Sequence, residues 1–175
     1  MPLGRAKPSL WGEKDCVMAE VNRPKVDYRY FNAVTPDFVR LTEDLDQELF
    51  VKLGEAQKAY HGFNRLAGIN DVVLAYQGTE AVGCASFKDH DGTAAEVKRV
   101  FVRPEYRGRG ISKELMAQIE QRALERGYQT LLVETSRSFS AAVGLYSAMG
   151  YQVIDNYPPY DVMAESVCFW KELAP

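Results

Sequence analysis

The stretch "RPEYRGRGIS" at residues 103–112 joins a strand-like run to a helical pattern through a proline and two Arg-Gly pairs. The apolar run before it ends at Pro104, and apolar residues recur at helical spacing from Gly110 onward. In such an arrangement the free N–H groups of the first helical turn point outward, and the helix dipole adds positive potential there. Because glycine lets an anion approach the backbone closely, this turn has the character of an anion site.

Positive charge gathers at this turn although the chain as a whole is acidic, with a formal net charge of -3. Nucleic acids and anionic membranes require a broad basic field, so we expect neither as a partner. A P-loop needs a lysine directly after its glycines, and the dinucleotide fingerprint needs a glycine where Lys113 stands. The pattern alone leaves open whether the glycines bind an anion or only form a tight turn.

The cysteines and histidines are too scattered to suggest a metal site. Cys16, Cys84 and Cys168 form no Cys-x-x-Cys pair, and neither histidine lies at metal-ligand spacing from them. An odd number of cysteines favours a reducing compartment. The sequence shows no signal peptide and no apolar run long enough to span a membrane. We therefore expect a soluble cytoplasmic protein without a metal or a membrane partner.

The hydrophobic pattern divides the chain into an N-terminal leader and one α+β domain. Residues 1–36 contain four prolines and no steady period, so we expect an irregular or partly extended leader there and the domain over 37–175. A helix is expected to cross over between two of the strands. Strands are expected over 37–41, 71–77, 80–88, 93–103, 128–135, 151–157 and 166–173, and helices from the cap Thr42 to Gly54 and over 55–68, 110–126 and 139–149.

The stretch "RPEYRGRGIS" and the segment "AAVGLYSAMGY" at 141–151 together resemble the GNAT-type N-acetyltransferases. The resemblance covers roughly residues 37–173, and the order of strands and helices agrees with the fold of that family. It implies an α+β fold with a mixed, mostly antiparallel sheet of about six or seven strands and helices on both faces.

The resemblance also implies acetyl-CoA as co-substrate. In this family the motif Q/R-x-x-G-x-G/A wraps the pyrophosphate of acetyl-CoA, and the strand before it binds the pantetheine amides through its backbone. Ser112 departs from the usual Gly or Ala at the last position of the motif. The expected cofactor-binding residues are Val100, Phe101, Val102, Arg107, Gly108, Arg109, Gly110, Ile111 and Ser112.

Acetyl transfer to an alkyl amine requires a proton acceptor, because such an amine, with a pKa of roughly 10, is almost wholly protonated at neutral pH. Glu134 and Glu96 lie where different family members carry a catalytic glutamate. We slightly favour Glu134, although a structural ion pair stays open for either one. Strand alternation predicts that Glu96, Lys98, Val100 and Val102 share one face.

Tyr146 matches the tyrosine that the family places near the CoA sulfur as proton donor. A phenol is neutral at pH 7 and can donate to a thiolate. Packing as a core aromatic is the alternative for Tyr146. Many relatives carry Asn at the start of this helix, where the present chain has Phe139.

The leading interpretation is an N-acetyltransferase in which the amine attacks directly, without a covalent enzyme intermediate. The expected acceptor is a primary amine of a small or amino-acid-like molecule. A non-catalytic acyl-CoA sensor and a protein N-terminal or lysine acetyltransferase stay open. A homodimer is also an open alternative, since family members often dimerise. Candidate acceptor-binding residues are Tyr60, Asn64, Tyr157, Tyr160 and Asp161.

Overall fold

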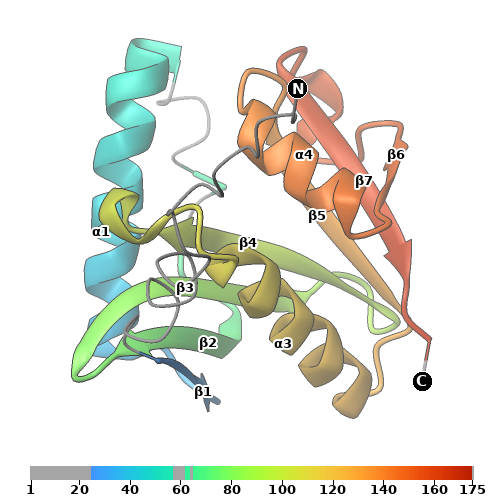
Figure 1. The fold of residues 1–175 in the computed structure, drawn as a ribbon. Helices are drawn as coiled ribbons and strands as arrows, with labels where there is room; N and C mark the ends of the chain where they lie inside the picture. The colour runs from blue at the N-terminus through green and yellow to red at the C-terminus, as the bar shows by residue number, and fades with distance from the viewer. Residues whose placement is uncertain (1–24, 57–61, 64, 175) are drawn as a thin grey trace, which may run out of the picture.

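A computed structural model describes residues 25–56, 62–63 and 65–174 of the chain. Within them seven strands form one sheet in the order β1-β2-β3-β4-β5-β7-β6 (Figure 1). Only β4 and β5 pair in parallel, and the other pairs are antiparallel. The predicted α+β fold is confirmed. The strands are β1 Val26–Phe31, β2 Ile69–Gln77, β3 Glu80–Asp89, β4 Ala94–Val102, β5 Thr130–Ser136, β6 Gln152–Ile154 and β7 Ser166–Glu172, and the helices are α1 Pro36–Leu53, α3 Ile111–Glu125 and α4 Ser140–Ala148.

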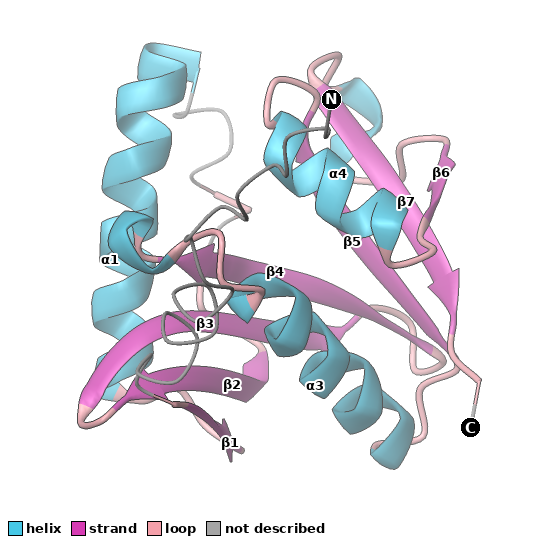
Figure 2. Ribbon diagram, in the orientation of Figure 1, coloured by secondary structure: helices cyan, strands magenta, loops and turns pink. Residues whose placement is uncertain are grey.

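Helices cover both faces of the sheet, as Figure 2 shows. One core cluster joins Phe38 and Leu41 of α1 to β2 and β3. The other cluster joins Leu115 and Ile119 of α3, together with Tyr146 of α4, to the opposite face. Since a parallel pair of strands needs a long crossover, α3 connects β4 to β5 as the sequence predicted. In the described part of the chain no helix has the length and apolar character to cross a membrane.

Helix α1 begins earlier than expected, and the strand predicted over 37–41 is wrong. Thr35 caps the helix, because its hydroxyl accepts a hydrogen bond from the Phe38 amide at 3.2 Å. Pro36 occupies the first helical turn, where its missing N–H costs nothing. Phe38 and Leu41 are both fully buried at helical spacing, which a strand would not allow. Thr42, the expected cap, lies inside the helix.

Part of the expected irregular leader is an edge strand of the sheet. Strand β1 pairs antiparallel with β2, from Val26 opposite Gln77 to Phe31 opposite Val72. Residues 26–31 are thus an extended part of the expected leader, and pairing with β2 makes them a regular strand although their own pattern is weak. Residues 1–24 lie outside the described residues.

Two further predicted elements differ from the structure. In the range of the helix expected over 55–68, the described residues form a short 3-10 turn at Gly54–Ala56, and residues 62–63 and 65–68 are irregular or turn. Residues 57–61 and 64 lie outside the described part. The strand expected over 151–157 is limited to β6. Within the described residues β6 lies at the edge of the sheet and pairs with β7 alone, so few hydrogen bonds favour a longer strand.

Candidate active site

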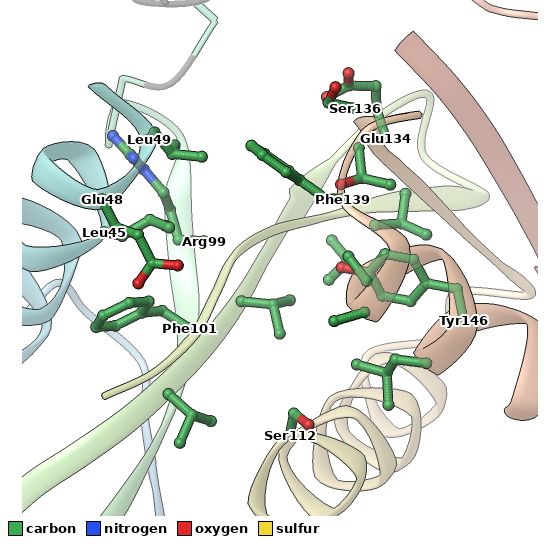
Figure 3. Close-up of a pocket in the computed structure, with 18 of the residues that line it drawn as sticks. Leu45, Glu48, Leu49, Arg99, Phe101, Ser112, Glu134, Ser136, Phe139 and Tyr146 are labelled. Carbon is green, nitrogen blue, oxygen red and sulfur yellow. The ribbon is translucent and has the colours of Figure 1, made fainter. Parts of the chain in front are cut away.

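The central feature of the site is the separation of β4 from β5. The parallel pairing joins Ala94–Val97 to Thr130–Val133 and stops there, although β4 continues to Val102 and β5 to Ser136. A cavity of about 410 Å³ lies where the strands part. Figure 3 shows side chains of α1 on one side of it and those of β5 and α4 on the other. Opening a sheet in this way exposes backbone N–H and C=O groups that a ligand can pair.

A β-bulge reorients β4 at the edge of this cavity. Ser86 pairs with Lys98 but Cys84 pairs with Phe101, so Arg99 and Val100 together oppose one residue of β3. Arg99 within the bulge has a φ of 59°, in the left-handed range that residues other than glycine seldom adopt. Phe101 therefore packs with the α1-side core, while Val100 and Val102 pack against the α3-side core.

Because of the bulge, the prediction that the alternating side chains from Glu96 to Val102 share one face of the strand is wrong. Ala95 and Val97 belong to the α3-side core, so Glu96 lies on the α1 side of the sheet. Val102 packs on the opposite side. Glu96, Lys98, Val100 and Val102 therefore do not share one face, because the extra residue at the bulge reverses the alternation beyond Lys98.

The glycine turn brings the start of α3 to one end of the cavity. Gly108 and Gly110 have φ of 73° and 77°, a conformation that residues with a Cβ rarely adopt. Gly110 stands at the N-cap position of α3 and provides no side-chain cap for the first-turn amides. Gly108 and Ser112 line the cavity. A Cβ built on either glycine would meet no described atom within 4 Å, so the backbone here is open to close approach by a ligand.

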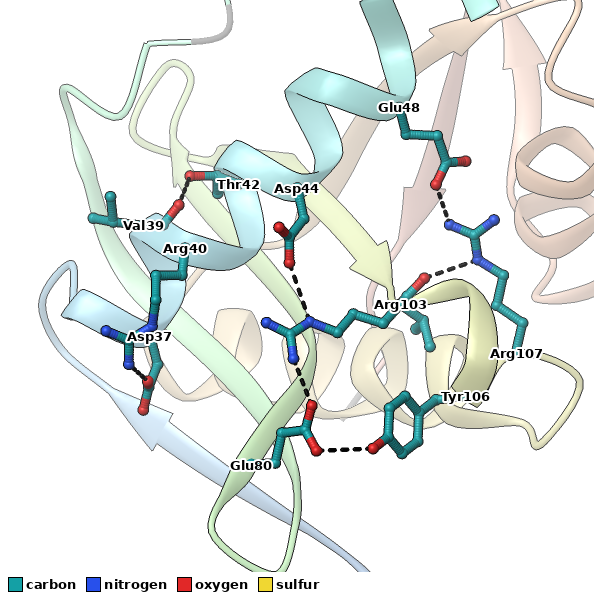
Figure 4. A network of polar contacts seen from close by, with 11 residues as sticks. Asp37, Val39, Arg40, Thr42, Asp44, Glu48, Glu80, Arg103, Tyr106 and Arg107 are labelled. Carbon is teal, nitrogen blue, oxygen red and sulfur yellow. Dashed lines mark hydrogen bonds and ion pairs between the residues drawn. The ribbon is translucent and has the colours of Figure 1, made fainter. Parts of the chain in front are cut away.

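The arginines at this turn are already engaged with other groups (Figure 4). Arg107 donates from Nε to the Val102 carbonyl at 2.8 Å and forms an ion pair with Glu48 of α1 at 2.5 Å. The guanidinium of Arg109 lies 5.7 Å from the ring centre of Tyr106. The fixed positive potential at the turn therefore comes mainly from the amides at the start of α3.

Tyr146 serves both the core and the cavity. It is 4% exposed, belongs to the α3-side core and contacts the rings of Tyr151 and Phe169. It also lines the cavity beside Glu134 (Figure 3). Burial, with a smaller effect from the charge of Glu134, raises the pKa of the Tyr146 hydroxyl well above its usual value. The phenol is therefore protonated at neutral pH and is able to donate.

Glu134 lines the cavity from β5 and accepts a hydrogen bond from the Ser166 hydroxyl at 2.5 Å. Burial raises the pKa of the Glu134 carboxyl, and this effect exceeds the opposing effects of Ser166 and of the Lys98 charge. A carboxyl with a raised pKa in a cavity is better matched to accepting a proton near neutral pH than an ordinary glutamate.

Glu96 lies in a different environment from Glu134, within what we call the Glu96 cluster (Glu96, Lys88, Lys98, Tyr157 and Tyr160). Its carboxylate accepts a hydrogen bond from the Tyr160 hydroxyl at 2.8 Å and lies 3.3 Å and 3.4 Å from the ammonium groups of Lys88 and Lys98. Burial acts to raise the pKa of Glu96, but the two lysine charges outweigh it and hold the pKa below its usual value. Glu96 is not among the residues that line the cavity.

The other predicted site residues lie in several different places. Val100, Phe101, Val102, Arg107, Gly108 and Ser112 line the cavity, whereas Arg109, Gly110 and Ile111 lie in the same turn without lining it. Tyr157 and Tyr160 belong to the Glu96 cluster, where both hydroxyls donate to Glu96. Asp161 is exposed. Tyr60 and Asn64 lie outside the described residues.

Sequence reasoning missed Lys98 as a site residue. Lys98 lines the cavity, is 7% exposed and donates to the Tyr160 hydroxyl at 2.7 Å. Burial lowers the pKa of its ammonium, and the charge of Glu96 opposes that shift. The signal in the sequence was a lysine two residues from Glu96 within an apolar strand. In the described part of the chain no group of three or more His, Cys, Asp or Glu side chains is placed to hold a metal ion.

Comparison with known proteins decides the family. The family model described as Acetyltransferase (GNAT) family matches residues 31–151. The chain belongs to the GNAT acetyltransferase family. It is accordingly an acyltransferase, and through this family membership a solved structure of a GNAT family acetyltransferase with acetyl-CoA bound supports acetyl-CoA as the co-substrate. The matched range contains the glycine turn, Glu134 and Tyr146.

Individual GNAT relatives support the same assignment. The IAA acetyltransferase of Azospirillum brasilense is 33% identical over 125 residues, which cover 70% of this chain and 81% of the relative. The uncharacterized N-acetyltransferase YsnE of Bacillus subtilis is 31% identical over 101 residues, covering 57% of this chain and 67% of the relative.

Solved structures agree with the GNAT fold. A Klebsiella pneumoniae protein assigned as an acyl-CoA N-acyltransferase has a TM-score of 0.70 at 27% sequence identity. The match covers 87% of this chain and 100% of that protein's chain. A GNAT family acetyltransferase from Elizabethkingia anophelis, solved with acetyl-CoA bound, has a TM-score of 0.61 at 20% identity, covering 86% and 100%. The second similarity is evidence for the fold alone.

Proposed function

We propose that this GNAT protein transfers the acetyl group of acetyl-CoA to the primary amine of a small or amino-acid-like molecule by direct attack of the amine. The observation that carries the proposal is the cavity between β4 and β5, which Glu134 and Tyr146 line together. The same cavity reaches Gly108 and Ser112 beside the start of α3. A proton acceptor, a proton donor and an anion site thus meet in one space.

The described residues fit acetyl-CoA, which supplies an acetyl group activated as a thioester. We assign its pyrophosphate to the backbone amides between Gly108 and Ser112, where the open space beside the glycines permits close approach. The backbone of Val100 and Phe101 is placed to contact the pantetheine arm, because β4 no longer pairs with β5 at these residues. The carbonyl of Val102 accepts a bond from Arg107 and keeps one lone pair for a further donor, so Val102, which lines the cavity, remains a proposed contact of the same arm.

Glu134 is the proposed general base. Its raised pKa and its place in the cavity suit it to take a proton from the incoming ammonium, directly or through a water molecule. The hydrogen bond from Ser166 fixes the orientation of the carboxyl group. Glu96 is the weaker candidate, because its negative charge is held by two lysines and it does not line the cavity.

Tyr146 is the proposed general acid. Its hydroxyl remains protonated at neutral pH because burial raises its pKa. Donation of that proton to the departing thiolate sulfur makes the thiolate a better leaving group. Helix α4 fixes the ring against Tyr151 and Phe169, so the hydroxyl is held without loss of side-chain freedom during the reaction.

A compact acceptor is favoured by the packing near the Glu96 cluster. Tyr160 is 1% exposed, and Phe63 packs against its ring with the centroids 5.8 Å apart. A small acceptor suits such a closely packed environment, and a protein N-terminus or lysine remains the alternative acceptor. The cytoplasmic location and the homodimer considered from the sequence stay predictions.

The proposal is tested by titration calorimetry with acetyl-CoA, followed by a thiol-release assay over a panel of small primary amines. We expect binding of acetyl-CoA, amine-dependent thiol release and an N-acetylated product identified by mass spectrometry. Thiol release that does not depend on the amine would show thioester hydrolysis instead. Failure to bind acetyl-CoA would overturn the assignment of the glycine turn.

A further inference from the structure

A buried ammonium group lies beside the proposed base and has no role in the mechanism above. Val97 and Val133 are the last residues that β4 and β5 pair before they separate. Lys98 and Glu134 are the next residues of the two strands. Lys98 and Glu134 therefore occupy corresponding positions on the two sides of the opening. Both residues line the cavity, and their charges interact.

The charges around Lys98 do not balance when Glu134 is protonated. Glu96 is the carboxylate shared by Lys98 and Lys88, at 3.4 Å and 3.3 Å. Two ammonium groups thus share one carboxylate, and Glu134 supplies a second negative charge only in its ionised form. Once Glu134 accepts a proton, a positive charge remains in a largely buried place, which is unfavourable unless an anion joins it.

Lys98 also has donor capacity for such an anion. An ammonium group has three N–H donors, and among the described residues Lys98 uses two of them, one on the Tyr160 hydroxyl at 2.7 Å and one on Glu96. The hydroxyl of Tyr160 donates to Glu96, which holds these groups in place. The third donor of Lys98 suits a carboxylate, since charge-assisted hydrogen bonds are the strongest of the ordinary kinds.

The other cations of the cavity are less suited to this role. Arg99 is held by both carboxylate oxygens of Asp46, at 2.5 Å and 3.3 Å. The side chain of Lys52 is half exposed and pairs with Glu48 at 2.5 Å. Glu48 also neutralises Arg107. Lys98 differs from Lys52 and Arg107 because its side chain is 7% exposed, against 50% and 42%. It differs from Arg99 because its carboxylate partner is shared with a second cation.

We propose that Lys98 binds a carboxylate of the acceptor, so that the acceptor is an α-amino acid or a close analogue. The amine of such a molecule lies toward Glu134 and its carboxylate toward Lys98, and the two opposite charges of one small zwitterion match the two groups across the opening. This inference rests on the proposed N-acetyltransferase function and specifies its substrate class.

The experiment compares three amino acids with the amines that share their side chains but lack the carboxylate: leucine with isoamylamine, phenylalanine with phenethylamine, and lysine with cadaverine. For each pair the ratio of kcat/KM is measured by thiol release in the wild type, in Lys98→Met and in Lys98→Arg. Because the same two acceptors are used throughout, their intrinsic reactivities cancel when the ratios are compared. We expect at least one pair to favour the amino acid, and Lys98→Met to reduce that preference by about tenfold or more.

Lys88→Met is the graded comparison, because it removes the surplus charge beside Glu96 but no group that lines the cavity. It should lower the preference for the amino acid less than Lys98→Met, which removes the N–H donors as well, and Lys98→Arg should retain more of the preference than Lys98→Met. Thermal unfolding and acetyl-CoA titration of each variant check that the fold persists. If Lys98→Met fails to fold, inhibition of the wild type by N-acetyl amino acids and by the matching N-acetyl amines tests the same contact.

The outcomes separate the two proposals. Thiol release with equal ratios in wild type and Lys98→Met overturns the role of Lys98 and leaves the N-acetyltransferase function standing. If N-acetyl amino acids and the matching N-acetyl amines inhibit the wild type equally, the role of Lys98 is likewise overturned. No thiol release with any acceptor, despite acetyl-CoA binding, overturns the proposed function and this inference with it.

Discussion

Replacement of Glu134 by glutamine removes the proposed proton acceptor while changing little else. The amide oxygen of glutamine can accept the bond that Ser166 now donates at 2.5 Å, so the local packing should persist. General base catalysis contributes about 10²–10⁴-fold to a rate, and we expect kcat/KM of Glu134→Gln to fall within that range. Affinity for acetyl-CoA, measured by calorimetry, should change little.

The pH dependence of this variant gives a sharper test than its rate. Burial raises the pKa of Glu134, so kcat/KM of the wild type should decline as the pH falls through that raised value. Glu134→Gln should lack this acidic limb. A raised carboxyl pKa also means that the stabilising contribution of Glu134 is present below the unfolded pKa and lost as pH rises through the folded pKa. At neutral pH the variant should therefore melt at the same temperature as the wild type or higher.

Glu96→Gln is the matched comparison. In contrast to Glu134→Gln, it should lower the melting temperature and keep the acidic limb of kcat/KM. The lysine charges hold the pKa of Glu96 low, so its stabilising contribution is present above the unfolded pKa and lost as pH falls through the folded pKa. Removing this charge leaves Lys88 and Lys98 without their shared carboxylate. Breaking a buried pair costs about 3 kcal/mol or more, which lowers Tm by roughly 6–12 °C in a chain of this size.

Two results would refute the assignment of the base. The first is an acidic limb that persists in Glu134→Gln and disappears in Glu96→Gln, which would make Glu96 the base. The second is an unchanged profile in both variants, which would exclude both carboxylates. Glu134→Gln with a lowered Tm at neutral pH would contradict the argument from its raised pKa.

The remaining predictions concern the anion site, the acid and the core. Gly110→Pro should abolish acetyl-CoA binding in calorimetry, because proline fixes φ near −65° where the structure has 77°, whereas Arg109→Ala should only weaken it. Tyr146→Phe should retain acetyl-CoA affinity and Tm while lowering kcat about 10²-fold or more; an unchanged kcat would leave Tyr146 a core residue only. Leu115→Ala, at a side chain that is 0% exposed between α3 and the sheet, should destabilise the protein by about 2–5 kcal/mol in urea unfolding, and a smaller loss would mean that the core closes around the cavity.

Local patterns in the sequence were sufficient for the parts of the fold that depend on neighbours in the chain. The apolar stripe over 110–126 and the glycine turn before it predicted α3 almost to its ends, Ile111–Glu125. The hairpin of β2 and β3 and the last strand followed in the same way. Tyr146 and Glu134 were found because the segments that contain them resemble a known family, and the structure brings both to one cavity.

The misses occurred where the sheet or a cap overrides local preference. Residues 37–41 alternate weakly like a strand, but Thr35 and Pro36 start a helix there and the sheet buries one side of it. Residues 26–31 lack a clear pattern, and β2 makes them a strand. The strand at 26–31 has no local signal, because its partner β2 lies far along the chain. Thr35 and Pro36, in contrast, are a local signal for the helix, which the strand-like alternation of residues 37–41 outweighed.

The sequence by itself determined the glycine turn before α3, since two glycines with positive φ and an uncapped helix start follow from consecutive residues. Only the tertiary structure decided which glutamate meets the cavity. The bulge at Arg99 and the separation of β4 from β5 place Glu134 in the cavity, while the paired lysines hold Glu96 outside it. Burial and charge partners set the pKa values of the two carboxyl groups in opposite directions, and both depend on residues that folding alone brings together.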